Sequence, residues 1–237
     1  QEGSSHPSAR AFPLERSNRQ MQLWDPATRE MTTVDTCFGT HHLNLDDNDT
    51  MWFTGSGPVV AWFDTKVLDE TGDEALAQGW TVQVLDTNGN GRRDAYVEPG
   101  EPMDPTKDTR IERGYYGVAP SPLDGSIWGS TLGMPGGLVR FVPGEDPVNT
   151  ALVEFYEVPW DDPDAPVQGY SPRGMDVDSN GVVWTVLSSG HFASFDRSQC
   201  DGPLNGPTAT GTHCSEGWTL YPFPGPNYQG AVDSGSA

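Results

Sequence analysis

The chain has 237 residues, of which 34 are acidic and 13 basic, so its formal net charge at pH 7 is −21. This charge disfavours nucleic acid and anionic membranes as partners, because phosphate groups would be repelled. The 28 Gly and 21 Pro make up about a fifth of the chain, against ~12% in average proteins, which argues against a helical bundle. Eight Trp, nine Phe and seven Tyr provide enough aromatic surface to predict a packed core rather than a disordered acidic chain.

The sequence shows no sign of a segment that crosses a membrane. No apolar run approaches the ~18 residues needed to span a bilayer. The chain begins with Gln1 and lacks a charged region followed by an apolar one. We therefore expect a mature secreted protein or a piece of a longer protein.

Three segments of the chain share one layout, at residues 41–64, 116–144 and 172–196. Each begins with an apolar stretch and an Asp- or Gly-containing turn, continues with a stretch carrying Trp, and ends with a stretch that closes on an aromatic residue. The Trp residues that hold the same place in each unit are Trp52, Trp128 and Trp184. No stretch shows a sustained helical period. A four-stranded antiparallel blade repeated around an axis, an all-β β-propeller, is therefore predicted.

The spacing of the units predicts an inserted region within a single domain that covers residues 1–237. The three Trp residues lie 76 and 56 positions apart, more than the ~40–45 residues of a compact propeller repeat. Residues 65–113 are the predicted insertion, and residues 21–36 are predicted to form the outer half of a preceding blade. Because only part of a ring of about six or seven blades is visible, we expect the remaining blades to come from the same protein or from a partner chain.

Two of the three cysteines bracket a loop rich in Gly, Pro and Thr. Cys200 and Cys214 enclose no helix or strand pattern, which is typical of a segment closed by a disulfide. Closing about 15 residues contributes ~3 kcal/mol, and a bridge favours a periplasmic or extracellular location; two reduced thiols are the alternative. Cys37 is left over, as a buried thiol or as the partner of a cysteine outside this chain.

The predicted insertion contains the sequence DTNGNGRRD at residues 86–94, which matches the first nine positions of an EF-hand-type calcium loop. The twelfth position is Val97, so the bidentate carboxylate would come from Glu98 in a shifted loop or from elsewhere. Because the motif lies in the insertion, the bound Ca²⁺ is expected to be structural. The alternative is an Asn-Gly-rich hairpin turn without an ion. The predicted ligands are Asp86, Asn88, Asn90, the backbone carbonyl of Arg92, Asp94 and Glu98.

Residues 171–196, SPRGMDVDSNGVVWTVLSSGHFASFD, resemble the blades of streptogramin (virginiamycin B) lyases and of the related NHL and SMP-30-type propellers. The resemblance covers residues 21 to 224, and the chain is also similar to secreted bacterial proteins in which a propeller accompanies a carboxypeptidase-regulatory-like domain. In the lyases, the blade Trp is followed by Phe-Thr-Glu, and nearby acidic and His residues hold Mg²⁺ and act as base. The matching triplets here, which start at Phe53, Gly129 and Thr185, contain no Glu.

Aligning the units on Trp places His41 and Arg173 at equivalent positions, with Tyr116 one residue before the corresponding position in the second unit and His42 next to His41. The innermost strands of a propeller line its channel, so these side chains are predicted to meet at the channel mouth. They would supply an imidazole base or metal ligand, a phenol acid and a guanidinium anion clamp. His191 is a fifth candidate, on the stretch after Trp184. The alternative is that these side chains hydrogen-bond within the channel wall and that Arg173 pairs with a carboxylate.

Two functions are therefore expected from different classes. The first is a secreted, lyase-like enzyme in which a divalent metal such as Mg²⁺ and a nearby His promote elimination or hydrolysis of a small cyclic or lactone-like substrate. The second is a non-enzymatic binding propeller, stabilised by calcium, for a protein or polysaccharide partner. Neither HExxH nor GxSxG occurs, which argues against hydrolases of those kinds.

Overall fold

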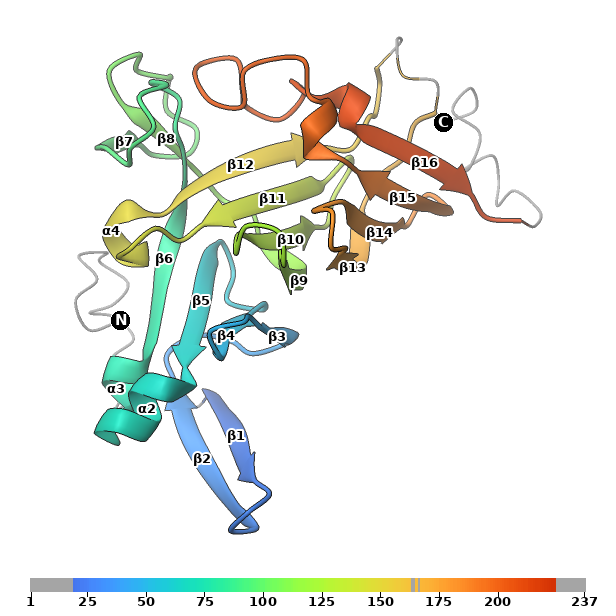
Figure 1. Cartoon of the computed structure of the whole chain (residues 1–237). Coiled ribbons are helices and arrows are strands. Elements are labelled where there is room, and N and C mark those ends of the chain that lie inside the picture. The colour runs from blue at the N-terminus through green and yellow to red at the C-terminus, as the bar shows by residue number, and fades with distance from the viewer. Residues whose placement is uncertain (1–18, 163–164, 166, 225–237) are drawn as a thin grey trace.

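The computed structural model describes residues 19–162, 165 and 167–224, and its core consists of three consecutive four-stranded antiparallel arrays. Figure 1 shows them following one another like blades. The fold is therefore all-β and propeller-like, as predicted.

The first array contains β3 (Leu43–Leu45), β4 (Thr50–Phe53), β5 (Val59–Asp64) and β6 (Gln78–Leu85). The second contains β9 (Tyr115–Pro120), β10 (Ile127–Thr131), β11 (Gly137–Val142) and β12 (Leu152–Glu157). The third contains β13 (Pro172–Val177), β14 (Val183–Leu187), β15 (His191–Phe195) and β16 (Trp218–Pro222).

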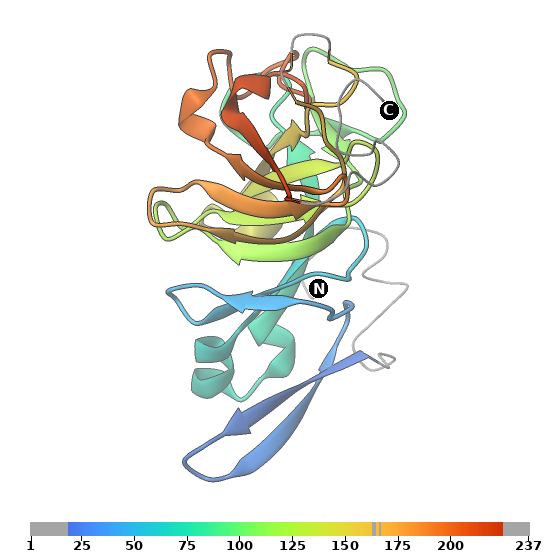
Figure 2. The same ribbon diagram turned by 90° about the vertical axis from the view of Figure 1, so that its right-hand side faces the viewer.

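A separate hairpin precedes the first array and short elements project between the strands. The hairpin pairs β1 (Arg19–Asp25) with β2 (Glu30–Thr36) and extends away from the arrays in both views (Figures 1 and 2). The short elements are α2 (Thr65–Thr71), α3 (Glu74–Ala77), β7 (Tyr96–Val97), β8 (Asp108–Ile111), α4 (Pro147–Thr150), η2 (Arg197–Gln199) and η3 (Ser215–Gly217). No helix of the described residues is long and apolar enough to cross a membrane.

Strand β6 lies inside residues 65–113, which the spacing of the repeated units predicts to be an insertion. It is the fourth strand of the first array, and all of its residues are buried. It also pairs with β8, and Leu85 pairs in parallel with Val153 of β12. The chain therefore makes two excursions, one through α2 and α3 before β6 and one through β7 and β8 after it.

A repeated hydrogen bond explains why an acidic turn precedes the blade Trp. The indole Nε1 of Trp52 donates to Asp46 Oδ2 at 2.9 Å, and that of Trp184 donates to Asp178 Oδ2 at 3.0 Å. In both turns the other carboxylate oxygen accepts backbone amides of the turn itself. Each Asp thus closes a hairpin and fixes the orientation of the indole that follows it.

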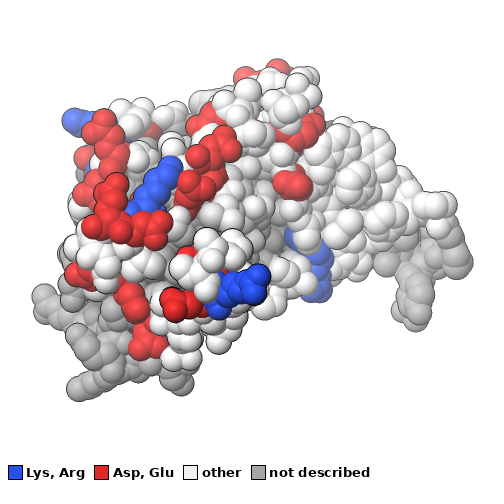
Figure 3. Space-filling model, turned by 60° about the horizontal axis from the view of Figure 1, so that its bottom comes forward, with Lys and Arg blue, Asp and Glu red and all other residues white. Residues whose placement is uncertain are grey.

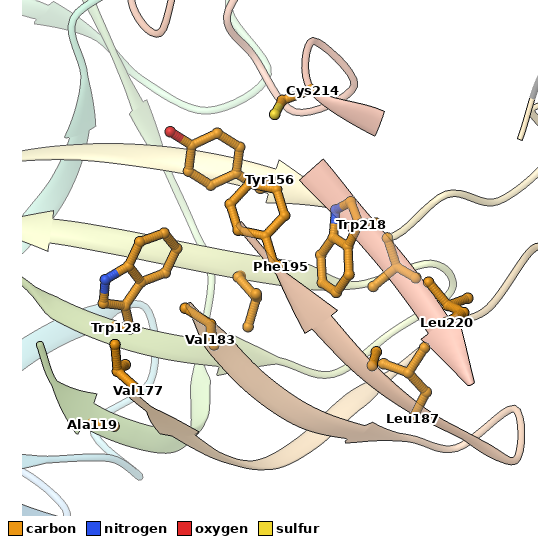
Figure 4. Packing of buried hydrophobic residues seen from close by; sticks show 13 residues of the cluster. Ala119, Trp128, Tyr156, Val177, Val183, Leu187, Phe195, Cys214, Trp218 and Leu220 are labelled. Atoms are coloured by element: carbon orange, nitrogen blue, oxygen red, sulfur yellow. The ribbon is translucent and has the colours of Figure 1, made fainter. Parts of the chain in front are cut away.

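The arrays pack together through aromatic rings on successive sheets. The ring of Trp52 lies 5.6 Å from that of Phe141 in the second array, and the ring of Trp128 lies 6.0 Å from that of Phe195 in the third. Figure 4 shows Trp128, Tyr156, Phe195 and Trp218 in the cluster between the second and third arrays. These contacts bury one face of each array against its neighbour.

The far face of the third array carries aromatic residues that remain accessible. Trp184 stacks on two rings of its own sheet. Its ring centroid lies 5.4 Å from that of Phe192 and 6.3 Å from that of Tyr221. Phe192 is 37% exposed and Tyr221 is 45% exposed. Trp52 and Trp128, by contrast, are buried by the next array.

The cysteines occupy two distinct environments. Cys200 and Cys214 form a disulfide, as predicted, and Cys214 belongs to the core cluster between the second and third arrays. Cys37 remains a buried thiol that donates to Gln78 Oε1 at 3.4 Å. The amide of Gln78 also donates to the carbonyl oxygens of Asp35 and Glu74, so this side chain holds the end of the β1–β2 hairpin against the start of β6.

Candidate functional site

The innermost strands of the three arrays, β3, β9 and β13, lie side by side, with β9 in the middle. The segment that leads into β3 carries His41 and His42. Its backbone pairs with Thr54, which accepts from the amide of His41 at 3.0 Å and donates to the carbonyl of His42 at 2.9 Å. The hydroxyl of Thr54 accepts the amide of His42 at 3.0 Å. Both histidines are exposed, so their position is fixed by the backbone while their rings remain accessible.

Four of the five predicted site residues meet at this end of the inner strands. The rings of His41 and His42 are 4.2 Å apart in an edge-to-face arrangement. Tyr116 lies 5.6 Å from the first ring and 5.2 Å from the second. The guanidinium carbon of Arg173 lies 5.4 Å from the centre of the Tyr116 ring, within the range of a cation–π contact. We call His41, His42, Tyr116 and Arg173 the mouth cluster.

The close approach of β13 to β9 depends on Gly117, which is not among the predicted site residues. The amide of Gly117 donates to Ser130 Oγ at 2.8 Å, and the same hydroxyl donates to the carbonyl of Arg173 at 2.5 Å. A Cβ at Gly117 would lie 3.1 Å from that carbonyl oxygen and 3.0 Å from Met175 Cγ. Gly117 and Ser130 thus bring Arg173 next to Tyr116. The sequence feature that could have identified Gly117 is the alignment on Trp, in which Gly117 holds the position equivalent to His41 and Arg173.

The guanidinium of Arg173 is also held from its own sheet. Its Nε donates to Ser188 Oγ at 3.0 Å. The side chain remains exposed, and the predicted pairing with a carboxylate is replaced here by contacts with a hydroxyl and an aromatic ring. The cluster presents a positive charge in a protein in which acidic residues outnumber basic ones, as they do on the face shown in Figure 3. It can therefore attract an anionic ligand that most of the surface repels.

His191 is the fifth candidate, and the structure does not bring it into the mouth cluster. It lies on β15, its side chain is completely buried, and its Nδ1 lies 3.0 Å from Ser189 Oγ. An imidazole that is inaccessible to solvent is also inaccessible to a substrate at the mouth. The sequence could not determine this, because alternation along the chain is interrupted by the turn at residues 188–190.

The loop at residues 86–94 closes around its first residue. Asp86 Oδ1 accepts the amides of Gly89 and Asn90 at 2.8 Å and 3.0 Å, and Oδ2 accepts the amide of Gly91 at 2.8 Å. Gly91 has φ +77°, a left-handed conformation that glycine adopts without strain. The loop thus has a tight turn at its sixth position, where the calcium-loop motif requires one.

The remaining predicted calcium ligands lie around this loop, except for Glu98. The side-chain amides of Asn88 and Asn90 donate to Asp94 Oδ2 at 3.1 Å and 2.5 Å. The amide of Arg92 donates to Asn90 Oδ1 at 2.9 Å, which bends the chain at the seventh position. Glu98, in contrast, is exposed and forms an ion pair with Arg110. In the described part of the chain, no group of three or more His, Cys, Asp or Glu side chains is placed to hold a metal by itself, so amide and carbonyl oxygens would have to complete any such site.

Two cavities lie away from the mouth cluster, each of about 310 Å³. One is lined by Glu157, Trp160, Asp162, Thr212 and neighbouring residues. The other lies beside the 86–94 loop, between Asp86, Gly91, Leu152, Glu154, Leu204 and Asn205.

Comparison with known proteins finds similarity among solved structures. No protein-family model matches the chain, and no curated protein matches it. Among solved structures, a gluconolactonase from Xanthomonas campestris is similar, with 20% identity and a TM-score of 0.35 over 81% of this chain and 60% of that chain. Regucalcin, a calcium-binding protein from Agrobacterium tumefaciens, is similar with 15% identity and a TM-score of 0.30 over 91% of this chain and 70% of that one. The chain therefore spans about 60% of the length of the gluconolactonase.

Proposed function

We propose that the mouth cluster is the active site of a secreted enzyme that eliminates from, or hydrolyses, a small cyclic, lactone-like substrate. The observation that carries this proposal is the meeting of two imidazoles, a phenol and a guanidinium from three successive inner-strand segments. These groups combine a base, an acid and an anion-binding charge at one accessible point. The disulfide between Cys200 and Cys214 supports an oxidising location outside the cytoplasm.

Each side chain has a distinct role in hydrolysis. An imidazole of His41 or His42 takes a proton from water, which attacks the carbonyl carbon of the lactone. Arg173 stabilises the negative charge that develops on the carbonyl oxygen. The ring C–O bond then breaks, and the Tyr116 hydroxyl donates a proton to the departing alkoxide. In elimination, the imidazole instead removes a proton from the carbon next to a carbonyl, and Arg173 stabilises the enolate. The enolate then forms a C=C bond as the C–O bond of the adjacent carbon breaks, and the ester oxygen leaves as part of a carboxylate.

A metal at this mouth fits the donor set less well than the oxyanion or enolate that forms from a lactone does. Mg²⁺ prefers oxygen ligands, whereas His41 and His42 offer imidazole nitrogens, which suit zinc-type ions. Two such ligands are fewer than the three usual for catalytic zinc, and the charge of Arg173 nearby opposes a cation. The proposed steps therefore use only the chain's own residues.

Turnover of a panel of five- and six-membered lactones, followed by acid release, tests the proposal. Replacing both histidines (H41A/H42A) or Arg173→Ala should reduce turnover at least ~100-fold, with unchanged circular dichroism. Arg29→Ala is the matched control, because it removes an exposed arginine from the β1–β2 turn. Absence of turnover across the panel, or full activity of Arg173→Ala, would reject the enzymatic role.

The second candidate is a non-enzymatic, calcium-stabilised binding propeller for a protein or polysaccharide partner. The closed loop around Asp86 favours it, as does the cavity beside Trp160, where an aromatic ring and acidic groups could bind a sugar. Glycan-array binding by the wild-type chain, retained in H41A/H42A and lost in Trp160→Ala, would favour this candidate over the enzyme.

The face of Trp184, Phe192 and Tyr221 is the proposed contact for remaining blades, in the same protein or in a partner chain. The first two arrays support this, because Trp52 and Trp128 are each covered by a phenylalanine of the next array. A further blade would cover Trp184 in the same way.

A further inference from the structure

Asp108 brings a third carboxylate to the 86–94 loop, from a neighbouring strand. It is the first residue of β8, and its side chain is completely buried. Its Oδ2 accepts the backbone amide of Asp94 at 2.7 Å. Its Oδ1 is also buried and accepts no hydrogen bond of normal geometry from the described residues. A buried carboxylate oxygen without a partner costs free energy, which a cation or a donor would offset.

The charges around Asp108 point to a cation as the missing partner. The nearby carboxylates of Asp86 and Asp94 repel that of Asp108, and the backbone amides of Asp94 and Asn88 partly offset this repulsion. The guanidinium of Arg93 interacts electrostatically with Asp108. No hydrogen bond between them is formed, and Arg93 Nη1 donates to Thr81 Oγ1 at 2.9 Å and to the carbonyl of Ala151 at 3.3 Å. Three carboxylates thus interact in this region, and no basic side chain of the described residues bonds to Asp108 Oδ1.

We propose that the 86–94 loop binds Ca²⁺ and that Asp108 supplies the carboxylate that an EF-hand-type loop takes from its twelfth position. The inference rests on the calcium-stabilised candidate described above and assigns to it a ligand outside the motif. Asp108 lies 14 residues after Asp94 along the chain, so loop spacing could not identify it. Pairing of β8 with β6 places it at the base of the loop.

Ca²⁺ prefers six to eight hard oxygen ligands, and in the proposed site five residues of the loop and of β8 supply oxygen atoms of this kind. Asp86, Asp94 and Asp108 contribute carboxylates, and Asn88 and Asn90 contribute amide oxygens. Those amide oxygens each accept one backbone amide, which leaves a second lone pair for a cation. Glu98, the alternative within the motif, is engaged by Arg110.

Calcium at this site would also hold the disulfide loop. Asp86 Oδ2 accepts the side-chain amide of Asn205 at 2.8 Å, and the carbonyl of Asp86 accepts the amide of Gly206 at 2.7 Å. Both partners lie between Cys200 and Cys214. An ion that immobilises Asp86 therefore restrains the loop that docks on it.

Isothermal titration of CaCl₂ into the chelator-treated chain tests the inference. We expect Asp108→Asn to weaken calcium binding at least tenfold, and Asp86→Asn to abolish it. Glu98→Gln and the exposed-turn variant Asp47→Asn should bind as the wild type does, which separates this site from diffuse binding to an acidic surface. Calcium should also slow hydrogen exchange at Gly206 in the wild type but not in Asp108→Asn.

Thermal unfolding in EDTA separates a lost ligand from a damaged fold. Without calcium, Asp108→Asn should be at least as stable as the wild type, because it removes an unpaired buried charge; with calcium the wild type should be the more stable. Wild-type affinity in Asp108→Asn would overturn the role of Asp108 while leaving the calcium loop intact. Absence of calcium binding by the wild type would overturn both the inference and the calcium-stabilised candidate. It would leave the enzymatic proposal for the mouth cluster unaffected.

Discussion

The indole ring of Trp52 packs against the ring of Phe141 with 5.6 Å between their centroids, and this contact joins the first array to the second. Phe141 is completely buried. Replacing it with Ala should lower the free energy of unfolding by about 3–5 kcal/mol, because a large cavity replaces the ring. Urea unfolding followed by tryptophan fluorescence measures the loss. Phe192→Ala is the matched control on the accessible face and should cost less than about 1 kcal/mol; equal losses would contradict the distinction between covered and uncovered faces.

Changing Gly117 should disturb the mouth cluster without touching its side chains. In Gly117→Ala the new Cβ would lie 3.0 Å from Met175 Cγ and 3.1 Å from the carbonyl oxygen of Arg173. We expect β13 to shift from β9 at a cost of about 1–3 kcal/mol in stability, with turnover or ligand binding falling roughly tenfold as Arg173 moves away from Tyr116. Gly174→Ala is the control, since a Cβ there meets nothing within 4 Å. Identical behaviour of the two variants would refute this positioning role.

Removing the disulfide should destabilise the chain. Cys200 and Cys214 are 14 residues apart, and the double variant C200A/C214A should lose about 3 kcal/mol, because the unfolded chain gains conformational freedom. Denaturant unfolding of the oxidised protein, the reduced protein and the double variant measures this. A reductant should lower the stability of the wild type and leave the double variant unchanged.

The thiol of Cys37 should be unreactive in the folded protein. Burial raises its pKa to about 11, so at pH 8 only about one molecule in a thousand carries the reactive thiolate. Labelling with a chromogenic disulfide reagent should be very slow in buffer and complete in 6 M urea. Rapid labelling of the native protein would show that the start of β6 does not enclose this side chain.

His213 should make stability depend on pH in the weakly acidic range. Burial lowers its pKa from the ordinary value of 6.5, although the charges of Glu154 and Glu216 oppose the shift. The folded state therefore favours the neutral imidazole. Its contribution is fully present above about pH 6.5 and is lost as the pH falls from there through the lower folded-state pKa. The midpoint temperature of the wild type should fall more between pH 7.5 and pH 5.5 than that of His213→Gln; parallel curves would exclude this role.

The repeated units made the three arrays predictable from the sequence, because a turn Asp and a blade Trp recur with the same hydrogen bond in the first and third units. The meeting of His41, Tyr116 and Arg173 followed from the same alignment. Strand β6 is strand-like in the sequence, because apolar and polar residues alternate from Trp80 to Val84. Its place in the first array was not recognised, because the excursion through α2 and α3 separates it from β5.

The positions of Asp108 and His191 could not be obtained in this way. Asp108 reaches the calcium loop only through strand pairing across a long excursion. The orientation of His191 depends on a turn that interrupts the alternation. Both depend on contacts between segments that no local pattern encodes.

The parallel pairing of β6 with β12 means that the first and second arrays are joined by strand pairing, whereas the third array is joined to them in other ways. It links the first and second arrays into a single ten-stranded sheet, whereas strand pairing in the third array stays within that array among the described residues. The third array is held to the second by the aromatic cluster seen in Figure 4, by the hydrogen bond from Ser130 Oγ to the carbonyl of Arg173, and by the ion pair between Arg197 and Glu154. Opening between these two parts would break these contacts and those of the disulfide loop with Asp86, while leaving every strand ladder intact. The third array can therefore detach as a preformed unit before the rest of the sheet loses its order.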